Sequence, residues 1–216
     1  VAAGDYAAAR QHLAAMAAWA AGGAGSSDNL YEDGDDDRYG FILVGRHLLA
    51  RLDLADGNYL AAAKALRQLS VEYESAVIAD PGAGFQTLNG QLAHFESAVA
   101  LWQAQESAKA LTLFAALVPP PVDGQPIFDP DNAATYIGLL AAAMDDNASR
   151  GQLVTVAEEL PVVFRGLAYW VLAQHQKGEP LQAAYRDKAN ETIGNVLIWP
   201  RVTDKEGDHV QHPEER

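Results

Sequence analysis

No cysteine occurs among the 216 residues of the chain. This absence excludes a disulfide framework, thiolate ligands for zinc or an iron–sulfur cluster, and a cysteine nucleophile. A chain of this length buries enough surface in one core to fold without a covalent or metal staple. We therefore expect a fold that rests on the packing of its secondary structure.

Positive charge is also scarce, with 15 lysines and arginines against 29 aspartates and glutamates and a net charge of −14. An acidic chain repels the phosphates of nucleic acids and of anionic lipid surfaces, so we expect no nucleic-acid partner. No apolar run approaches the roughly 18 residues that a membrane span requires, so we expect no membrane span. The chain begins with Val1, which fits either a trimmed start or the removal of an N-terminal segment. The compartment therefore stays open between the cytoplasm and the periplasm or another exported location.

Alternating runs of β-branched residues, which are typical of strands, are nearly absent from the sequence. Alanine, by contrast, is abundant, and it has the highest intrinsic helix propensity because it loses no side-chain entropy. The sequence therefore predicts an all-α chain.

Short junctions between apolar segments predict helical hairpins. Gly57-Asn58 precedes the helical segment 59–77, and Gly178-Glu179-Pro180 precedes the segment 181–196. Glycine favours the left-handed position that ends a helix, while Asn, Asp and Pro suit the start of the next one. A connection of two or three residues makes the two helices antiparallel neighbours.

We expect one domain of such hairpins, because no change in composition demands a second. The predicted organisation is a helical-hairpin repeat domain over 1–199, with an acidic loop at 21–39, a Pro-rich connector at 119–131 and a polar C-terminal tail at 200–216.

The segment LLARLDLADGNYLAAAKALRQL carries a resemblance to the tetratricopeptide repeat (TPR) family. Gly57, Tyr59, Ala62 and Leu66 follow the spacing of glycine, aromatic, alanine and large apolar residue in the second helix of that repeat. Weaker matches begin at Gly4 and, with glutamine in place of glycine, at Gln105. The resemblance implies antiparallel hairpins stacked as a short α-solenoid.

The predicted stack is irregular, because the junctions at Gly4, Gly57 and Gln105 are spaced more widely than the 34 residues of the family repeat. In TPR proteins the first helices of the hairpins line a concave groove that binds peptides. The resemblance places six residues of this sequence on such a groove, where they would suit an acidic or extended peptide: His47, Arg51, Phe95, Trp102, Arg165 and His175.

The sequence contains no recognisable catalytic constellation. No GxSxG, P-loop or GxGxxG motif is present, and the six histidines form neither HxxxH nor HExxH. We therefore predict no catalytic residues, no cofactor and no enzymatic activity.

The acidic loop is the most unusual local feature, and Asp33, Asp35 and Asp37 are weak candidates for a divalent cation site. A helix-loop-helix calcium site starting at Asp33 needs glycine at its sixth position and glutamate at its twelfth. Arg38 and Val44 occupy those positions, so we expect a solvated loop and no resident metal.

These observations predict a non-enzymatic scaffold or binding module that holds a protein or peptide between its hairpins. Two alternatives remain open. The motif LLARLDLADGNY is similar to segments of the SusD-like glycan-binding surface proteins, although this chain is shorter. The second alternative is an all-α enzyme that uses the acidic loop with a divalent cation.

Overall fold

The computed structural model describes residues 6–22, 34–79, 84–120, 132–175 and 180–194, and this part of the chain contains helices and no strand. The prediction of an all-α chain is thereby confirmed. The elements in chain order are α1 (Tyr6–Gly22), α2 (Gly34–Ala55), α3 (Tyr59–Ala79), α4 (Gly84–Gln103), α5 (Ser107–Leu117), α6 (Ala133–Ala143), α7 (Asn147–Val156), the short 3₁₀ helix η2 (Ala157–Glu159), α8 (Val162–His175) and α9 (Leu181–Gly194).

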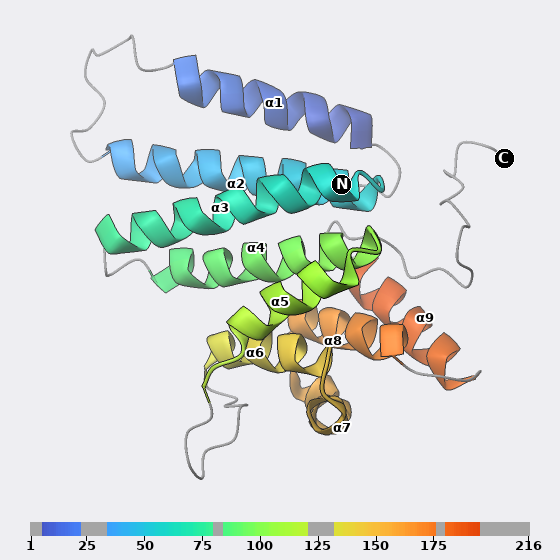
Figure 1. Ribbon diagram of the computed structural model, residues 1–216. Helices are drawn as coiled ribbons and strands as arrows, with labels where there is room; N and C mark the ends of the chain where they lie inside the picture. Colours follow the sequence, from blue (N-terminus) through green and yellow to red (C-terminus); the bar gives the residue numbers. More distant parts are fainter. Residues whose placement is uncertain (1–5, 23–33, 80–83, 121–131, 176–179, 195–216) are drawn as a thin grey trace, which may run out of the picture.

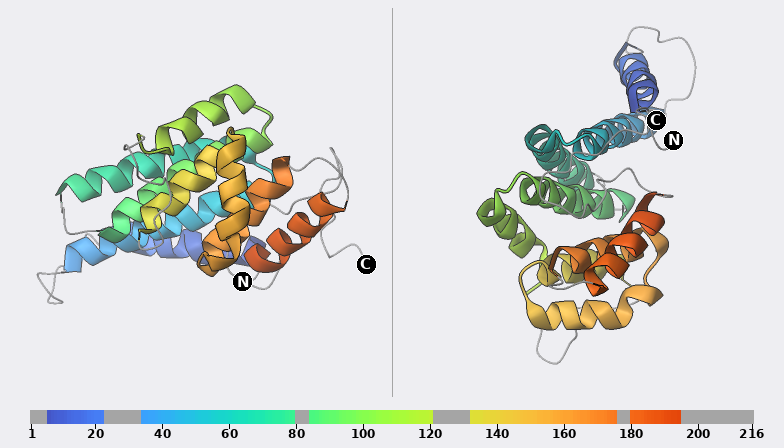
Figure 2. Two further views of the ribbon diagram at one scale, coloured as in Figure 1. Left: turned by 90° about the horizontal axis from the view of Figure 1, so that it is seen from below. Right: turned by 90° about the vertical axis from the view of Figure 1, so that its right-hand side faces the viewer.

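The helices follow one another through the molecule largely in chain order. At one end α1 packs on α2, α2 packs on α3, and α3 packs on α4 (Figure 1). α5 and α6 then contact α4, and α7, α8 and α9 lie at the other end, where α8 and α9 pack on each other (Figure 2). Most contacts therefore join elements that are close in sequence. None of the helices in the described segments combines the length and the apolar character needed to cross a membrane.

Gly57 sets the turn between α2 and α3. Its φ of 81° is left-handed, a conformation that glycine adopts without steric cost. The amide of Asn58 donates to the carbonyl of Asp53 (2.8 Å), and the amide of Gly57 donates to the carbonyl of Leu54 (3.3 Å). This pair of hydrogen bonds is the Schellman motif. The helix boundary predicted at Gly57-Asn58 is confirmed.

The turn between α4 and α5 has the same hydrogen bonds without a glycine. The amide of Glu106 donates to the carbonyl of Leu101 (2.9 Å), and the amide of Gln105 donates to the carbonyl of Trp102 (3.0 Å). Gln105 takes the left-handed position with φ 62°. A residue with a side chain is strained in this conformation, so the turn forms at a cost that Gly57 avoids.

The acidic loop is shorter than predicted, because α1 continues to Gly22 and α2 already begins at Gly34. The aspartates at 35–37 therefore lie in the first turn of a helix. Residues 23–33, most of the Pro-rich connector and the tail at 200–216 lie outside the described residues.

Two helices form the centre of the core. Every residue from 92 to 100 in α4 and from 166 to 173 in α8 is buried. The stretch in α4 includes three polar side chains, His94, Glu96 and Ser97. A buried polar side chain without a hydrogen-bond partner destabilises a fold. The partners of these three side chains therefore point to a candidate site.

Candidate functional site

Glu96 is a carboxylate in the interior of the helical stack, and its side chain has an exposed fraction of 0%. Nε2 of His47 in α2 lies 2.5 Å from one carboxylate oxygen. Arg51, one turn further along α2, approaches the other oxygen with Nη2 at 2.7 Å and Nε at 2.9 Å. We call His47, Arg51 and Glu96 the buried triad.

The two partners of Glu96 determine its charge. Burial by itself would raise the pKa of this carboxyl group. The charges of Arg51 and His47, with the hydrogen bonds from both, outweigh that effect and lower the pKa to about 2. Glu96 is therefore an anion at neutral pH, and its ion pairs connect α2 to α4.

Residues of α3 complete the surroundings of the triad. The ring of Tyr73, which is 2% exposed, lies 5.9 Å from the ring of His47. Burial raises the pKa of Tyr73 to about 12, and its hydroxyl has no hydrogen-bond partner in the described part of the chain. Nearer the surface, Arg46 binds both carboxylate oxygens of Glu72. The triad side chains link α2 to α4, and α3 contributes the ring of Tyr73 beside them.

The six residues predicted to line a groove lie in several surroundings. His47 and Arg51 lie together but point inward, to Glu96. Phe95 is fully buried and packs on Phe114 with ring centroids 5.4 Å apart.

Trp102 and His175 meet near the C-terminal ends of α4 and α8, with ring centroids 5.5 Å apart. Burial, and secondarily the charge of Arg150, lowers the pKa of His175 to about 4. No hydrogen bond, ion pair or ring contact among the described residues joins Arg165 to any of the other five predicted groove residues.

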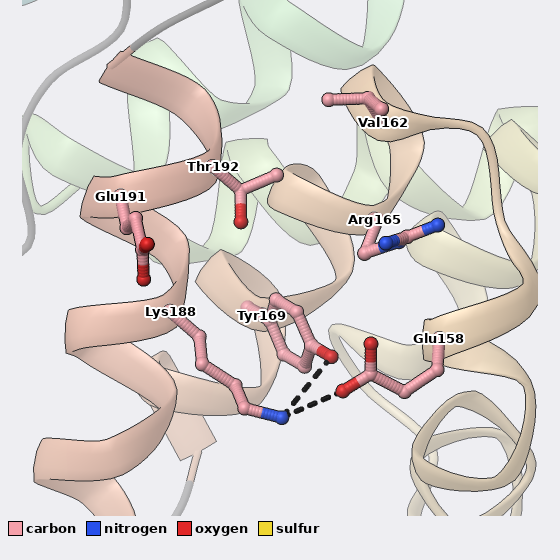
Figure 3. Close-up of a pocket in the computed structure, with 7 residues that line it drawn as sticks. All are labelled: Glu158, Val162, Arg165, Tyr169, Lys188, Glu191 and Thr192. Carbon is pink, nitrogen blue, oxygen red and sulfur yellow. Dashed lines mark hydrogen bonds and ion pairs between the residues drawn. The ribbon is translucent and has the colours of Figure 1, made fainter.

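Arg165 instead lines an open cleft of about 320 Å³ between α8 and α9 (Figure 3). The spacing of three and four residues places one face of each helix on the cleft. The lining residues are Val162, Arg165 and Tyr169 from α8, Lys188, Glu191 and Thr192 from α9, and Glu158 from η2.

Lys188 crosses the cleft from α9 toward η2, as Figure 3 shows. Its Nζ lies 2.6 Å from Oε1 of Glu158 and 3.4 Å from the hydroxyl of Tyr169. The same atom is 4.8 Å from the centroid of the Tyr169 ring, within range of a cation–π interaction. The hydrogen bond between them lowers the pKa of Glu158 and raises the pKa of Lys188. Both side chains are therefore charged, and both are about half exposed or more, at 63% and 50%.

Arg165 is directed to a different side of the cleft. Its Nε and Nη2 donate to the carbonyl of Leu160, at 3.3 and 3.1 Å. In Figure 3 the guanidinium extends away from Lys188, toward the turn between η2 and α8. The backbone carbonyl therefore holds this cation at the edge of the cleft.

A close approach of α8 and α9 beside the cleft depends on Gly166. A Cβ atom at this position would lie 2.5 Å from Cγ1 of Ile193 and 3.3 Å from its backbone nitrogen. On the same pair of helices the rings of Tyr169 and Tyr185 stack with centroids 6.1 Å apart. These contacts fix the two walls relative to each other.

Glu96, Glu158 and Lys188 were not predicted as site residues from the sequence. Glu96 is the one acidic residue in the largely apolar segment HFESAVALW. A lone carboxylate in such a segment indicates a buried ion pair, but it matches no motif. Glu158 and Lys188 are far apart in sequence, and only the packing of α9 on α8 brings them together.

The weak metal candidates are not tested by the structure. Asp33 and the side chains of Asp35 and Asp37 lie outside the described residues. Within the described residues, no three histidine, aspartate or glutamate side chains are grouped as a metal site would require.

No protein-family model matches this chain, and no curated protein or solved structure matches it.

Proposed function

We propose that this chain is a non-enzymatic binding module of stacked, TPR-like helical hairpins, and that it binds a protein or peptide at the cleft between α8 and α9. The observation that carries the proposal is the cleft itself. It is open to solvent, and its lining side chains offer charges of both signs, two hydroxyl groups and an exposed valine.

The arrangement of the helices supports this proposal. Consecutive helices pack on one another from α1 to α5, and α8 packs on α9. Packing between sequence neighbours is the principle of helical repeat proteins, which expose extended surfaces to their partners. The Schellman turn at Gly57 matches the junction within the hairpin that most resembles a TPR.

Three of the predicted groove residues are buried or paired inside the fold, so we place the binding surface at the cleft. His47 and Arg51 are paired with Glu96, and Phe95 has no exposed surface. Arg165 alone of the predicted residues lines the cleft. Val162 at the rim is 48% exposed, and exposed apolar surface beside charged groups is common at protein interfaces.

Two matched substitutions test the proposal. Val162→Trp places a large ring over the cleft, whereas Val154→Trp places the same ring on α7, at a valine that is 49% exposed and outside the cleft lining. Proteins captured from an extract of the source organism by wild type and by each variant are compared by mass spectrometry. The partner is then purified, and its affinity is measured by calorimetry.

We expect a partner that binds Val154→Trp as tightly as it binds the wild-type protein. The same partner should bind Val162→Trp at least about tenfold more weakly than wild type, because the loss of a contact of about 1.4 kcal/mol has that effect. If every purified partner binds both variants equally, the cleft is not the binding site and the proposal is wrong.

A further inference from the structure

The cleft is rich in hydrogen-bond acceptors. Glu158 and Glu191 stand on opposite walls, and the hydroxyl oxygens of Tyr169 and Thr192 lie between them (Figure 3). Arg165, one of the two cations of the lining, donates to the carbonyl of Leu160 instead. Two of the acceptors, the carboxylate of Glu158 and the hydroxyl of Tyr169, face the ammonium group of Lys188.

Lys188 shows what kind of group these acceptors bind. Its ammonium lies against a carboxylate, a phenol oxygen and the face of the same phenol ring. A carboxylate beside an aromatic ring is a typical arrangement for holding a cation. Because Lys188 and Glu158 are exposed, their ion pair is weak, and a competing cation can displace the lysine at little cost.

A guanidinium fits these acceptors better than an ammonium does. It offers five N–H donors in a planar fork that matches a carboxylate through two parallel hydrogen bonds, and it also stacks on aromatic rings. The net charge of −14 further attracts a cationic partner and repels an acidic one.

We propose that the cleft binds an arginine side chain of the partner, whose guanidinium takes the place of the Lys188 ammonium at Glu158. This inference rests on the proposed function, and it names the chemistry of the partner: a basic protein segment with an exposed arginine. Lys188 then acts as an internal competitor that occupies the site when the partner is absent.

The test uses N-acetyl-arginine amide as the probe. Its binding is measured by ¹H–¹⁵N NMR of the whole chain at low ionic strength. N-acetyl-citrulline amide has nearly the same shape without the charge, and N-acetyl-lysine amide distinguishes a guanidinium from a simple ammonium. We expect saturable shifts at the amides of 162–169 and 188–192 with the arginine probe, weaker ones with the lysine probe, and none with citrulline.

Two substitutions in the cleft are expected to act in opposite directions. Glu158→Gln removes the carboxylate and should weaken binding of the arginine probe by about fivefold or more, as expected for the loss of a charge-assisted bidentate hydrogen bond. Lys188→Met removes the competitor but keeps an apolar stem against Tyr169, and it should tighten binding by about threefold, since an exposed ion pair is worth little.

The matched control is the exposed pair of Lys109 and Glu106 on α5, whose charged atoms lie 2.9 Å apart. Glu106→Gln and Lys109→Met should leave binding of the probe unchanged. Shifts around Glu106 as large as those around Glu158 would mean attraction by the net charge alone, and they would overturn the inference. Tighter or equal binding of citrulline would do so too, as would weaker binding by Lys188→Met.

The two proposals fail separately. If a partner depends on Val162 but the arginine probe does not bind, the cleft is a binding site for a different chemistry and only this inference is wrong. If no partner is sensitive to Val162→Trp, the proposed function is wrong, and this inference, which rests on it, falls with it.

Discussion

Glu96 of α4 and His47 of α2 share a hydrogen bond of 2.5 Å between side chains that are 0% and 5% exposed. Arg51 binds the same carboxylate from the next turn of α2. Taking one partner away from a buried ion pair leaves an uncompensated charge in the interior, which costs far more than the loss of a surface pair. The side-chain link between α2 and α4 in the buried triad therefore depends on a single carboxylate.

Glu96→Gln should lower the free energy of unfolding by about 3 kcal/mol, because Arg51 loses its buried counter-ion. Urea unfolding at pH 7 measures this change. Glu72→Gln, which breaks the partly exposed pair with Arg46, is the control and should cost no more than about 1 kcal/mol. Equal effects of the two substitutions would contradict a closed triad.

Acid should reduce stability through His94. This side chain is 8% exposed, and its burial, together with the charge of Arg67, lowers its pKa from 6.5 to about 4. As the pH falls below 6.5 the unfolded chain gains a proton that folded His94 resists, so stability is lost between pH 6.5 and about 4. Urea midpoints measured across this range should fall less steeply in His94→Gln. Part of the slope should remain, because the pKa of His175 is lowered in the same direction. An unchanged slope would show that His94 does not resist protonation.

Ala62 and Ala61 are adjacent in α3 but differ in their surroundings, since Ala62 is 0% exposed and Ala61 is exposed. Ala62→Leu adds three carbons to a packed contact and should cost about 1–3 kcal/mol. Ala61→Leu should be nearly neutral, because leucine is almost as good a helix former as alanine. Urea unfolding of the two variants measures both changes in stability. A larger loss of stability with Ala61→Leu would mean that the buried face of α3 is assigned incorrectly.

Gln105→Gly should stabilise the protein by about 1 kcal/mol, because it relieves a left-handed residue that carries a side chain. The reverse change, Gly57→Gln, should destabilise by a similar amount. A Cβ atom at Gly57 has no atom closer than 4.0 Å, so the cost there comes from the backbone alone. Thermal or urea unfolding gives both values, and a loss of stability in Gln105→Gly would indicate that the glutamine side chain contributes more than its strain.

Gly166→Ala should destabilise by about 1–3 kcal/mol, because the new methyl group collides with Ile193 and pushes α9 away from α8. Gly151→Ala is the control, since nothing lies within 4 Å of a Cβ atom at this position in α7. It should stabilise by about 0.5–1 kcal/mol through helix propensity. The combination of Gly166→Ala with Ile193→Ala should recover part of the loss if the collision is its cause.

The local features of the chain were predictable from the sequence because they depend on neighbouring residues. The all-α class follows from alanine-rich segments without strand patterns, and the turn at Gly57 follows from a residue that adopts left-handed backbone angles without steric cost. The cap of α7 is local in the same way, since the side chain of Asp146 accepts a hydrogen bond from the amide of Ser149, three residues away, at 2.6 Å.

The direction in which each functional side chain points was decided by the tertiary structure. His47 and Arg51 were expected on an open groove, yet they turn inward because α4 presents a carboxylate 45 to 49 residues further along the chain. Lys188 meets Glu158 over a separation of 30 residues, which depends on how closely Gly166 lets α9 approach α8. Helix periodicity places a residue on a face but does not say which helix covers that face. For the buried triad and for the cleft, long-range packing alone supplied that answer.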